Sequence, residues 1–309
     1  MVLGKFKESE VFMSITFRNY SPQPFFTDDY RKVRDFLIRV DSPKITSRMS
    51  WSAWEWAVTH RQRDQDNLDK IGLWEDDGKL IAIATYECPL GEAFICIDEA
   101  YDYLKPELIT YAKENLHDKG KLTLSIPDGD YAFMKEAMAQ GFRPTMNNDH
   151  HALLDIDSIP TFELPNGFSF VCMADDWDWY KYNRVMWRGF NHSDTPPYDD
   201  EFIEKRKQML SSPMIIPELV VAIKAPDGNY ASHCTLWHRP GDTVCDLEPL
   251  ATDPEYRLMG LGKMVIYEAC KRCEKLGAKQ LSWALSQQFY CNIGFYPTHT
   301  YTYWELKSS

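Results

Sequence analysis

The chain has 309 residues, of which 44% are hydrophobic and 14% aromatic, and this is typical of a globular protein with room for two domains. Its formal net charge of −12 disfavours nucleic acid as the main partner, because phosphate binding needs a basic surface. No apolar run reaches the roughly 18 residues of a membrane helix, and residues 1–8 lack the apolar core of a signal peptide. We therefore expect a cytoplasmic protein with no membrane partner.

An internal repeat organises the chain. Residues 71–87 and 219–238 each predict a hairpin, with its turn at Gly78 in the first segment and at Gly228 in the second. A strand, a helix, another strand and a glycine-phenylalanine pair, at Gly141 or Gly294, follow each hairpin. The offsets of 150 and 153 residues between the paired glycines are nearly constant. The sequence therefore predicts two related domains, 1–157 and 158–309.

The first copy lacks a feature that the second copy has. Its strand 93–97 leads into residues 98–106, which contain no glycine and three carboxylates that would repel phosphate. We therefore expect the first domain to be a non-catalytic scaffold.

In the second copy, residues 243–251 alternate as a strand, with Asp246, Glu248 and Leu250 on one face. Pro249 cannot donate to a sheet ladder, so it predicts a bulge inside this strand. Backbone groups beside the bulge then lose their partners, and an extended ligand that carries amides could pair with them.

The strand leads into a helix through the pattern R-x-x-G-x-G, from Arg257 to Gly262, followed by Lys263. Two glycines let the backbone approach a ligand, and the N–H groups at a helix start favour negative charge. The junction therefore predicts a pyrophosphate site. The alternative is that Gly260 and Gly262 only permit a tight turn. The Walker pattern and the dinucleotide fingerprint are both absent.

Residues 247–263, L-E-P-L-A-T-D-P-E-Y-R-L-M-G-L-G-K, and 289–295, F-Y-C-N-I-G-F, resemble the GNAT (Gcn5-related N-acetyltransferase) superfamily. The resemblance implies an α/β (α+β) fold of two tandem domains, each with a mixed, mostly antiparallel twisted sheet and flanking helices, the first domain being degenerate. It also implies acetyl-CoA (coenzyme A) as the cofactor. Its implied contacts are Leu250, Ala251 and Thr252 for pantetheine, and Arg257, Leu258, Met259, Gly260, Leu261, Gly262 and Lys263 around the pyrophosphate.

The resemblance assigns two catalytic roles. Tyr290 matches the family tyrosine that assists the departing thiolate, and Glu248 stands where family members carry a carboxylate that deprotonates the amine. The alternatives are a packed aromatic for Tyr290 and a solvated or salt-bridged strand residue for Glu248. Ala137 occupies the equivalent of Tyr290 in the first copy, which fits a non-catalytic role. The family's asparagine before the tyrosine is replaced by Ala284, and the segment 286–288 is short.

The resemblance places the acceptor beside residues 175–200, where aromatic residues alternate with carboxylates. Such a surface suits a cationic amine, although we prefer the simpler interpretation of a helix with tryptophans in the core and aspartates in water. We also expect core packing for Trp51, Trp54 and Trp56, buried free thiols for the eight cysteines, and no metal site.

The sequence thus predicts an acyl-CoA-dependent N-acyltransferase that transfers acetyl to the amine of a small molecule by direct attack in a ternary complex. The principal alternative is a non-enzymatic acyl-CoA-binding module or sensor, in which Tyr290 would be dispensable. A carrier of unrelated nucleotides that uses the same anion site is a further alternative. The acceptor's identity and the oligomeric state are not encoded in any motif.

Overall fold

The structure is a computed structural model, which describes residues 15–40, 49–284 and 287–306. Its strands belong to one sheet: β1 (Ile15–Asn19), β2 (Gly72–Asp76), β3 (Lys79–Thr85), β4 (Glu92–Ile97), β5 (Thr123–Pro127), β6 (Phe142–Asp155), β7 (Ser169–Cys172), β8 (Val220–Lys224), β9 (Tyr230–Trp237), β10 (Val244–Thr252), β11 (Gln280–Ala284) and β12 (Tyr296–Leu306). The α-helices are α1 (Asp28–Val40), α2 (Trp51–Thr59), α3 (Lys105–Asn115), α4 (Tyr131–Ala139), α5 (Trp179–Gly189), α6 (Asp200–Gln208), α7 (Leu261–Glu274) and α8 (Gln288–Asn292). Short 3-10 helices are η1 (Gln65–Lys70), η2 (Glu99–Leu104), η3 (Ile156–Ser158), η4 (Pro217–Leu219) and η5 (Pro254–Tyr256).

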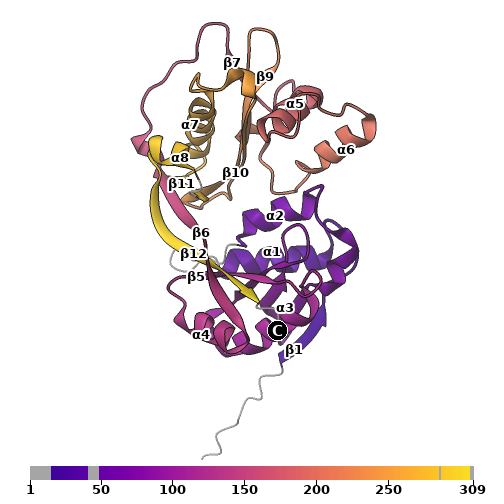
Figure 1. Cartoon of the computed structure of the whole chain (residues 1–309). Coiled ribbons are helices and arrows are strands. Elements are labelled where there is room, and N and C mark those ends of the chain that lie inside the picture. The colour runs from indigo at the N-terminus through magenta and orange to yellow at the C-terminus, as the bar shows by residue number, and fades with distance from the viewer. Residues whose placement is uncertain (1–14, 41–48, 285–286, 307–309) are drawn as a thin grey trace, which may run out of the picture.

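The two copies form two lobes joined by β6 and β12 (Figure 1). The strand order is β1-β2-β3-β4-β5-β12-β6-β11-β10-β9-β8-β7, so β1 to β5 of one copy mirror β7 to β11 of the other. Both predicted hairpins are present as the antiparallel pairs β2–β3 and β8–β9. Pairing is parallel only for β4–β5 and β10–β11 among the described strands, which confirms the mixed, mostly antiparallel sheet.

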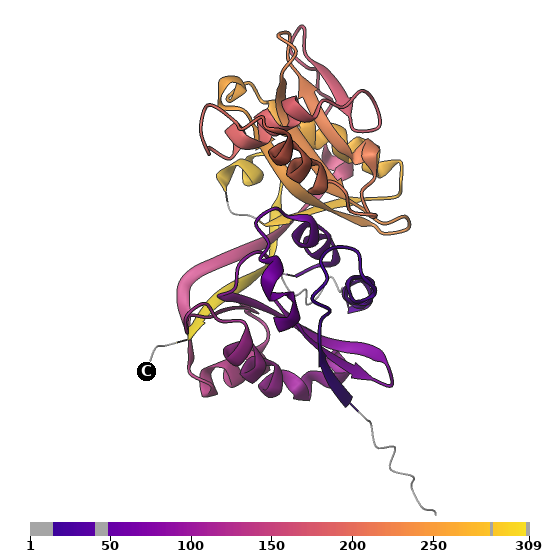
Figure 2. The ribbon, with the colours of Figure 1, turned by 90° about the vertical axis from the view of Figure 1, so that its right-hand side faces the viewer.

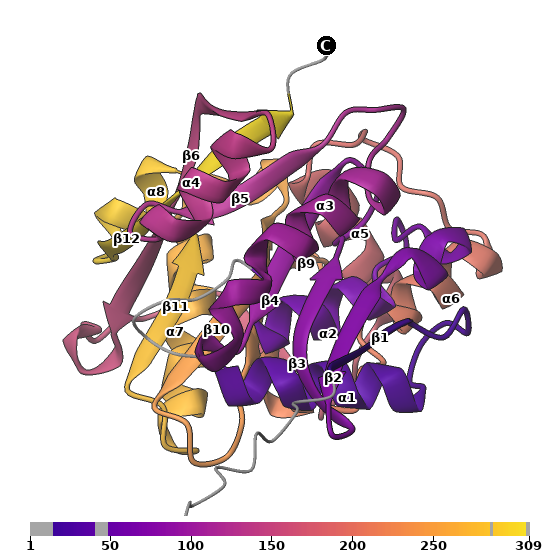
Figure 3. The same ribbon diagram turned by 90° about the horizontal axis from the view of Figure 1, so that it is seen from below.

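The last strand of each repeat pairs with the other repeat. β12 lies between β5 and β6, whereas β6 lies between β12 and β11. Figure 2 shows both strands running from one lobe into the other. Figure 3 shows β2, β3 and β4 of the first lobe side by side. Each copy therefore completes its sheet with a strand that the chain carries in the other copy.

Strand β10 has the predicted alternation, since every second side chain from Cys245 onward is buried. The predicted bulge is also present, because the pairing of β10 with β9 shifts between Leu247 and Leu250, on either side of Pro249. The face that carries Cys245 and Leu247 packs into the core of the second copy, so the opposite face, with Asp246 and Glu248, lies toward the first copy.

Helices cover both faces of the second copy's sheet (Figure 1). On β8, Val221 and Ile223 pack into the cluster that contains α7, whereas Val220 and Ala222 pack into the cluster that contains α5. The helix α7 ends at Glu274, and Leu276 beyond its end is 41% exposed. The cysteines are free thiols, but Cys88 is only half-buried and Cys291 is exposed, which corrects the expectation that all are buried.

Buried polar contacts join the lobes. Glu55 on α2 accepts hydrogen bonds from Tyr30 of its own copy and from Ser212 of the second copy, and the Thr59 hydroxyl lies 3.2 Å from the carbonyl of Met209. Burial raises the pKa of Glu55. Within residues 15–40, 49–284 and 287–306, none of the helices has both the length and the apolar character that a bilayer crossing requires.

Candidate functional site

Strands β10 and β11 separate beyond their first residues. Their parallel pairing covers Val244 to Asp246 on β10 and Gln280 to Ser282 on β11. From Leu247 to Thr252 the edge of β10 that faces β11 has no strand partner among the described residues. The backbone amides of Leu250, Ala251 and Thr252, predicted to bind pantetheine, lie on this stretch, so an extended ligand with amides could add to the edge as a strand does.

The loop between β10 and α7 exposes backbone N–H groups. Leu258 and Gly260 adopt positive φ angles of 64° and 78°, and Gly260 caps the helix without a side chain. The first backbone hydrogen bond of the helix runs from the N–H of Met264 to the carbonyl of Gly260. Across the described residues, no backbone hydrogen bond takes the N–H groups from Leu258 to Lys263, so they are available to an anion at the helix start.

Two glycines fit this loop for different reasons. Gly260 needs the left-handed conformation, which a residue with a Cβ atom adopts at a cost. Gly262 has an ordinary φ, but a Cβ atom there would lie 3.1 Å from the Thr252 hydroxyl and 3.5 Å from the ring of Phe289. The helix start is therefore packed closely against the end of β10, and the residues present fit a pyrophosphate and the pantetheine chain that follows it.

The two predicted cationic residues of the loop differ in their contacts. The guanidinium of Arg257 donates to the carbonyls of Thr252 and Gly189 and to the side chain of Asn191, which ties the loop to α5. Lys263 sits in the first turn of α7 and makes no ion pair with the described residues. Arg257 therefore holds the loop in place, and Lys263 is the better placed of the two to meet a phosphate.

The equivalent helix start in the first copy is filled by its own side chains. Lys105 opens α3 and lies 2.8 Å from Asp102 and 2.9 Å from Asp130. Its side chain is almost entirely buried, and the two carboxylates raise its pKa against the opposing effect of burial. A salt-bridged lysine thus occupies the space at this helix start.

A buried ion-pair cluster that sequence reasoning missed supports the loop between β10 and α7. Asp253 is fully buried, and its carboxylate lies 2.6 Å from Arg184 and 3.0 Å from Arg188, both on α5. The same carboxylate accepts the N–H of Glu255 and so caps η5. Because the arginines precede Asp253 by more than 60 residues, no local motif connects them.

Tyr290 lies on α8, buried to 5% exposure among the rings of Trp283, Phe289 and Phe295. Burial, followed by the negative charge of Glu248, raises its pKa well above the usual value of a phenol. The structure thus brings the two predicted catalytic residues close enough to influence each other. A phenol that keeps its proton can donate a hydrogen bond, but it is a poor proton donor to a thiolate.

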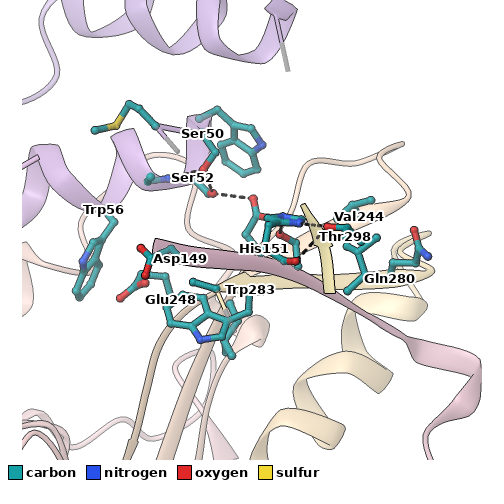
Figure 4. A pocket seen from close by; sticks show the side chains of 18 of the residues that line it. Ser50, Ser52, Trp56, Asp149, His151, Val244, Glu248, Gln280, Trp283 and Thr298 are labelled. Carbon is teal, nitrogen blue, oxygen red and sulfur yellow. Dashed lines mark hydrogen bonds between the residues drawn. The ribbon is translucent and has the colours of Figure 1, made fainter. Parts of the chain in front are cut away.

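Glu248 opens onto a cavity of about 590 Å³ between the two copies, at the end of the cavity that also holds Trp56 (Figure 4). The walls come from α2 of the first copy, from β10 and β11 of the second, and from the exchanged strands β6 and β12. Trp51 and Trp56, expected in the core, are largely buried and also line this cavity. Its volume suits a small organic molecule.

The segment 175–200, where the resemblance placed the acceptor, lies outside this cavity. Trp177 and Trp179 pack against the cluster under α5, and Asp178 caps α5 through the N–H groups of Tyr180 and Lys181. None of the described residues that line the cavity comes from this segment. These contacts agree with the simpler interpretation of the segment, a helix with tryptophans in the core and aspartates in water. Ala284 borders the cavity, but residue 286 of the shortened segment 286–288 lies outside the described residues.

The site therefore combines a helix start whose N–H groups make no backbone hydrogen bond, a strand edge without a neighbouring strand among the described residues, and a cavity that carries a carboxylate. Such a combination can hold an extended acyl carrier on one side of β10 and an acceptor on the other. Across the part of the chain that the structure describes, no group of His, Cys, Asp or Glu side chains has the makings of a metal site.

Comparisons with known proteins agree with this arrangement. Residues 178–297 match the family model described as acetyltransferase (GNAT) family. No curated protein matches the chain.

The structural matches extend over nearly the whole chain. A GCN5-related N-acetyltransferase from Sphaerobacter thermophilus is 14% identical with a TM-score of 0.61, and the match covers 94% of this chain and 95% of that one. A tandem GNAT protein from the clavulanic acid biosynthesis pathway is 12% identical with a TM-score of 0.62, covering 96% and 100%. N-myristoyltransferase from Saccharomyces cerevisiae is 12% identical with a TM-score of 0.56, covering 98% and 82%. These matches show that the chain shares the fold of these proteins. Residues 178–297 thus form a domain of the acetyltransferase (GNAT) family, the whole chain shares the fold of a tandem GNAT protein, and the protein is an N-acyltransferase.

Proposed function

We propose that the protein transfers acetyl from acetyl-CoA to the amine of a small molecule, by direct attack in a ternary complex. The observation that carries the proposal is the position of Glu248. It lies between the cavity and the edge of β10 where the pairing with β11 has ended. The pyrophosphate would meet the N–H groups from Leu258 to Lys263, and the pantetheine would pair along Leu250, Ala251 and Thr252. The bound carrier supplies an activated acyl group as a thioester.

The residues around that thioester have distinct roles. Glu248 takes one proton from the bound ammonium, and the amine nitrogen then forms a bond to the carbonyl carbon as the carbon–sulfur bond breaks. The second nitrogen proton passes to the departing sulfur, while the hydroxyl of Tyr290 donates a hydrogen bond to that sulfur. The products are an amide and a thiol, and the proton on Glu248 returns to solvent. Holding both reactants in one site supplies much of the rate.

An assay of thiol release tests the proposal. The full chain is incubated with acetyl-CoA and a panel of primary amines, and the released thiol is measured for the wild type and for Glu248→Gln. We expect kcat to fall on the order of 100-fold in the variant, because a general base is lost, while the Kd for acetyl-CoA stays unchanged.

Two other results are informative. Tight acetyl-CoA binding with no thiol release for any amine would favour a non-enzymatic binding module. Equal rates in the wild type and Glu248→Gln would remove Glu248 from the proposed chemistry.

A further inference from the structure

The cavity holds a carboxylate for which the proposed chemistry has no use. Asp246 points into the cavity from β10, two residues before Glu248 on the same face of the strand. Burial of the carboxylate raises its pKa. No lysine or arginine among the described residues forms an ion pair with it, and the neighbouring Arg239 is engaged by Asp242 at 2.7 Å.

Hydroxyl groups from both copies fix the orientation of Asp246. Ser52 on α2 of the first copy donates a hydrogen bond of 2.6 Å to its Oδ2 atom, and Ser282 on β11 stands opposite Asp246 in the parallel pairing of β10 with β11. Ser282 in turn lies 2.8 Å from Nε2 of His151, which β6 contributes from the first copy.

His151 is fixed on its other side as well. Its Nδ1 atom lies 2.8 Å from the hydroxyl of Thr298 on β12, and its ring stacks on His299 with centroids 4.4 Å apart. Burial lowers the pKa of His151 to about 4, so the ring is neutral at pH 7 and supplies no charge to Asp246. The carboxylate is thus aimed by neutral donors and left without a positive partner among the described residues.

A buried carboxylate without a cation is costly, and a ligand that brings a cation offsets that cost. Along a strand, side chains two residues apart on one face are separated by about 6–7 Å. A molecule that reaches both Asp246 and Glu248 therefore needs two basic or hydrogen-bond-donating groups at roughly that separation. The aromatic rings of Trp51, Trp56 and Phe94 offer apolar wall area to the chain that joins the two groups.

Resting on the proposed function, we propose that the acceptor is a small diamine or a similar dibasic molecule, with its reacting amine at Glu248 and its second ammonium group held by Asp246. Ser52, Ser282 and His151 act as positioning residues for that carboxylate. Ser52 and His151 come from the first copy. The copy without the glycine loop thus contributes to acceptor selection.

Calorimetric titration of two matched probes tests this inference. 1,5-Diaminopentane and 1-aminopentane are titrated at pH 7.5 into the full-length wild type, Asp246→Asn and Asp157→Asn, each saturated with coenzyme A. Asp157 is exposed and lies outside the cavity, so its variant controls for the loss of one negative charge. We expect the wild type and Asp157→Asn to bind the diamine at least on the order of ten-fold more tightly than the monoamine, and Asp246→Asn to lose this preference.

Ser52→Ala provides a second variant in case Asp246→Asn does not fold. It keeps the charge but removes one positioning donor, and we expect it to reduce the preference by a few-fold without changing the affinity for the monoamine. A wild type without preference for the diamine, a diamine that does not bind, or a preference that survives Asp246→Asn would overturn the inference.

Acetyl-CoA is titrated into the same samples. Tight acetyl-CoA binding without a diamine preference would remove only this inference. A diamine preference without acetyl-CoA binding would instead remove the proposed function and leave the cavity as a diamine site.

Discussion

At the scale of single residues, Tyr290 shows how burial limits what a side chain can do. Its ring is enclosed by aromatic neighbours, and both burial and Glu248 favour the neutral phenol. A phenol with a raised pKa holds its proton to higher pH than a free tyrosine, so the role that we propose for it is hydrogen-bond donation to a developing thiolate. Ala137 at the corresponding position of the first copy is fully buried and has no hydroxyl to offer.

Tyr290→Phe should therefore slow acyl transfer without weakening the binding of acetyl-CoA. We expect kcat to fall on the order of 100-fold, because one donor to the leaving group is lost, and the melting temperature to stay close to that of the wild type. In the wild type, the raised pKa predicts no loss of kcat from tyrosine ionisation up to pH 10. Steady-state kinetics from pH 6 to 10 check both points. A kcat unchanged by the substitution would assign Tyr290 to packing alone.

At the scale of elements, the turn from β10 to α7 depends on contacts that are distant in sequence. Arg257 ties the loop to the end of α5, and Asp253 anchors its beginning to two arginines of the same helix. The loop whose backbone N–H groups we propose for the pyrophosphate is thus held in place by α5. A loop whose shape is fixed before binding loses less conformational entropy when the ligand arrives.

Asp253→Asn should loosen this turn and weaken acetyl-CoA binding. It leaves Arg184 and Arg188 partly buried with less negative charge nearby, and we expect a loss of about 3 kcal/mol in the free energy of unfolding. Chemical denaturation and calorimetry measure the two effects. Asp200→Asn, at the exposed start of α6, is the control and should cost less than about 1 kcal/mol. Equal behaviour of the two variants would contradict an anchoring role for Asp253.

Several elements were predictable because their signals are local. Pro249 sufficed to predict the bulge in β10, and the glycine turns sufficed for both hairpins. The cluster around Asp253 was not predictable, because its charges meet only after α5 packs on β10. The same holds for Asp246 and His151, because Ser282, which bonds to His151 and stands opposite Asp246, lies on a strand between them in the sheet.

At the scale of the whole molecule, the exchange of β6 and β12 makes each copy depend on the other. β5 and β11 are equivalent edges, and β6 and β12 have similar patterns, so sequence periodicity alone does not decide which strand pairs with which edge. The structure places each last strand on the opposite copy. We propose that the segments 1–157 and 158–309 are halves of one folding unit, although each carries its own core cluster.

A fragment experiment follows from this pairing. The fragment 158–309 loses both neighbours of β12 and the β6 neighbour of β11, so we expect exposed strand edges, aggregation and no acetyl-CoA binding. Co-expression with 1–157 should restore a soluble complex that binds. Size-exclusion chromatography and calorimetry measure both outcomes. If 158–309 alone bound acetyl-CoA as tightly as the full chain, the two halves would be independent.

The central claim is that the start of α7 holds the pyrophosphate of an acyl-CoA. Its most direct test is calorimetric titration of acetyl-CoA into the wild type, Gly260→Glu and Gly228→Glu. Gly228 has a similar positive φ of 87° and open space where a Cβ atom would lie, so its variant carries a similar backbone strain away from the site. We predict that Gly260→Glu weakens binding on the order of 100-fold or more, because it places a carboxylate against the phosphates, and that Gly228→Glu binds like the wild type. No binding to the wild type, or equal binding to all three proteins, would contradict the account.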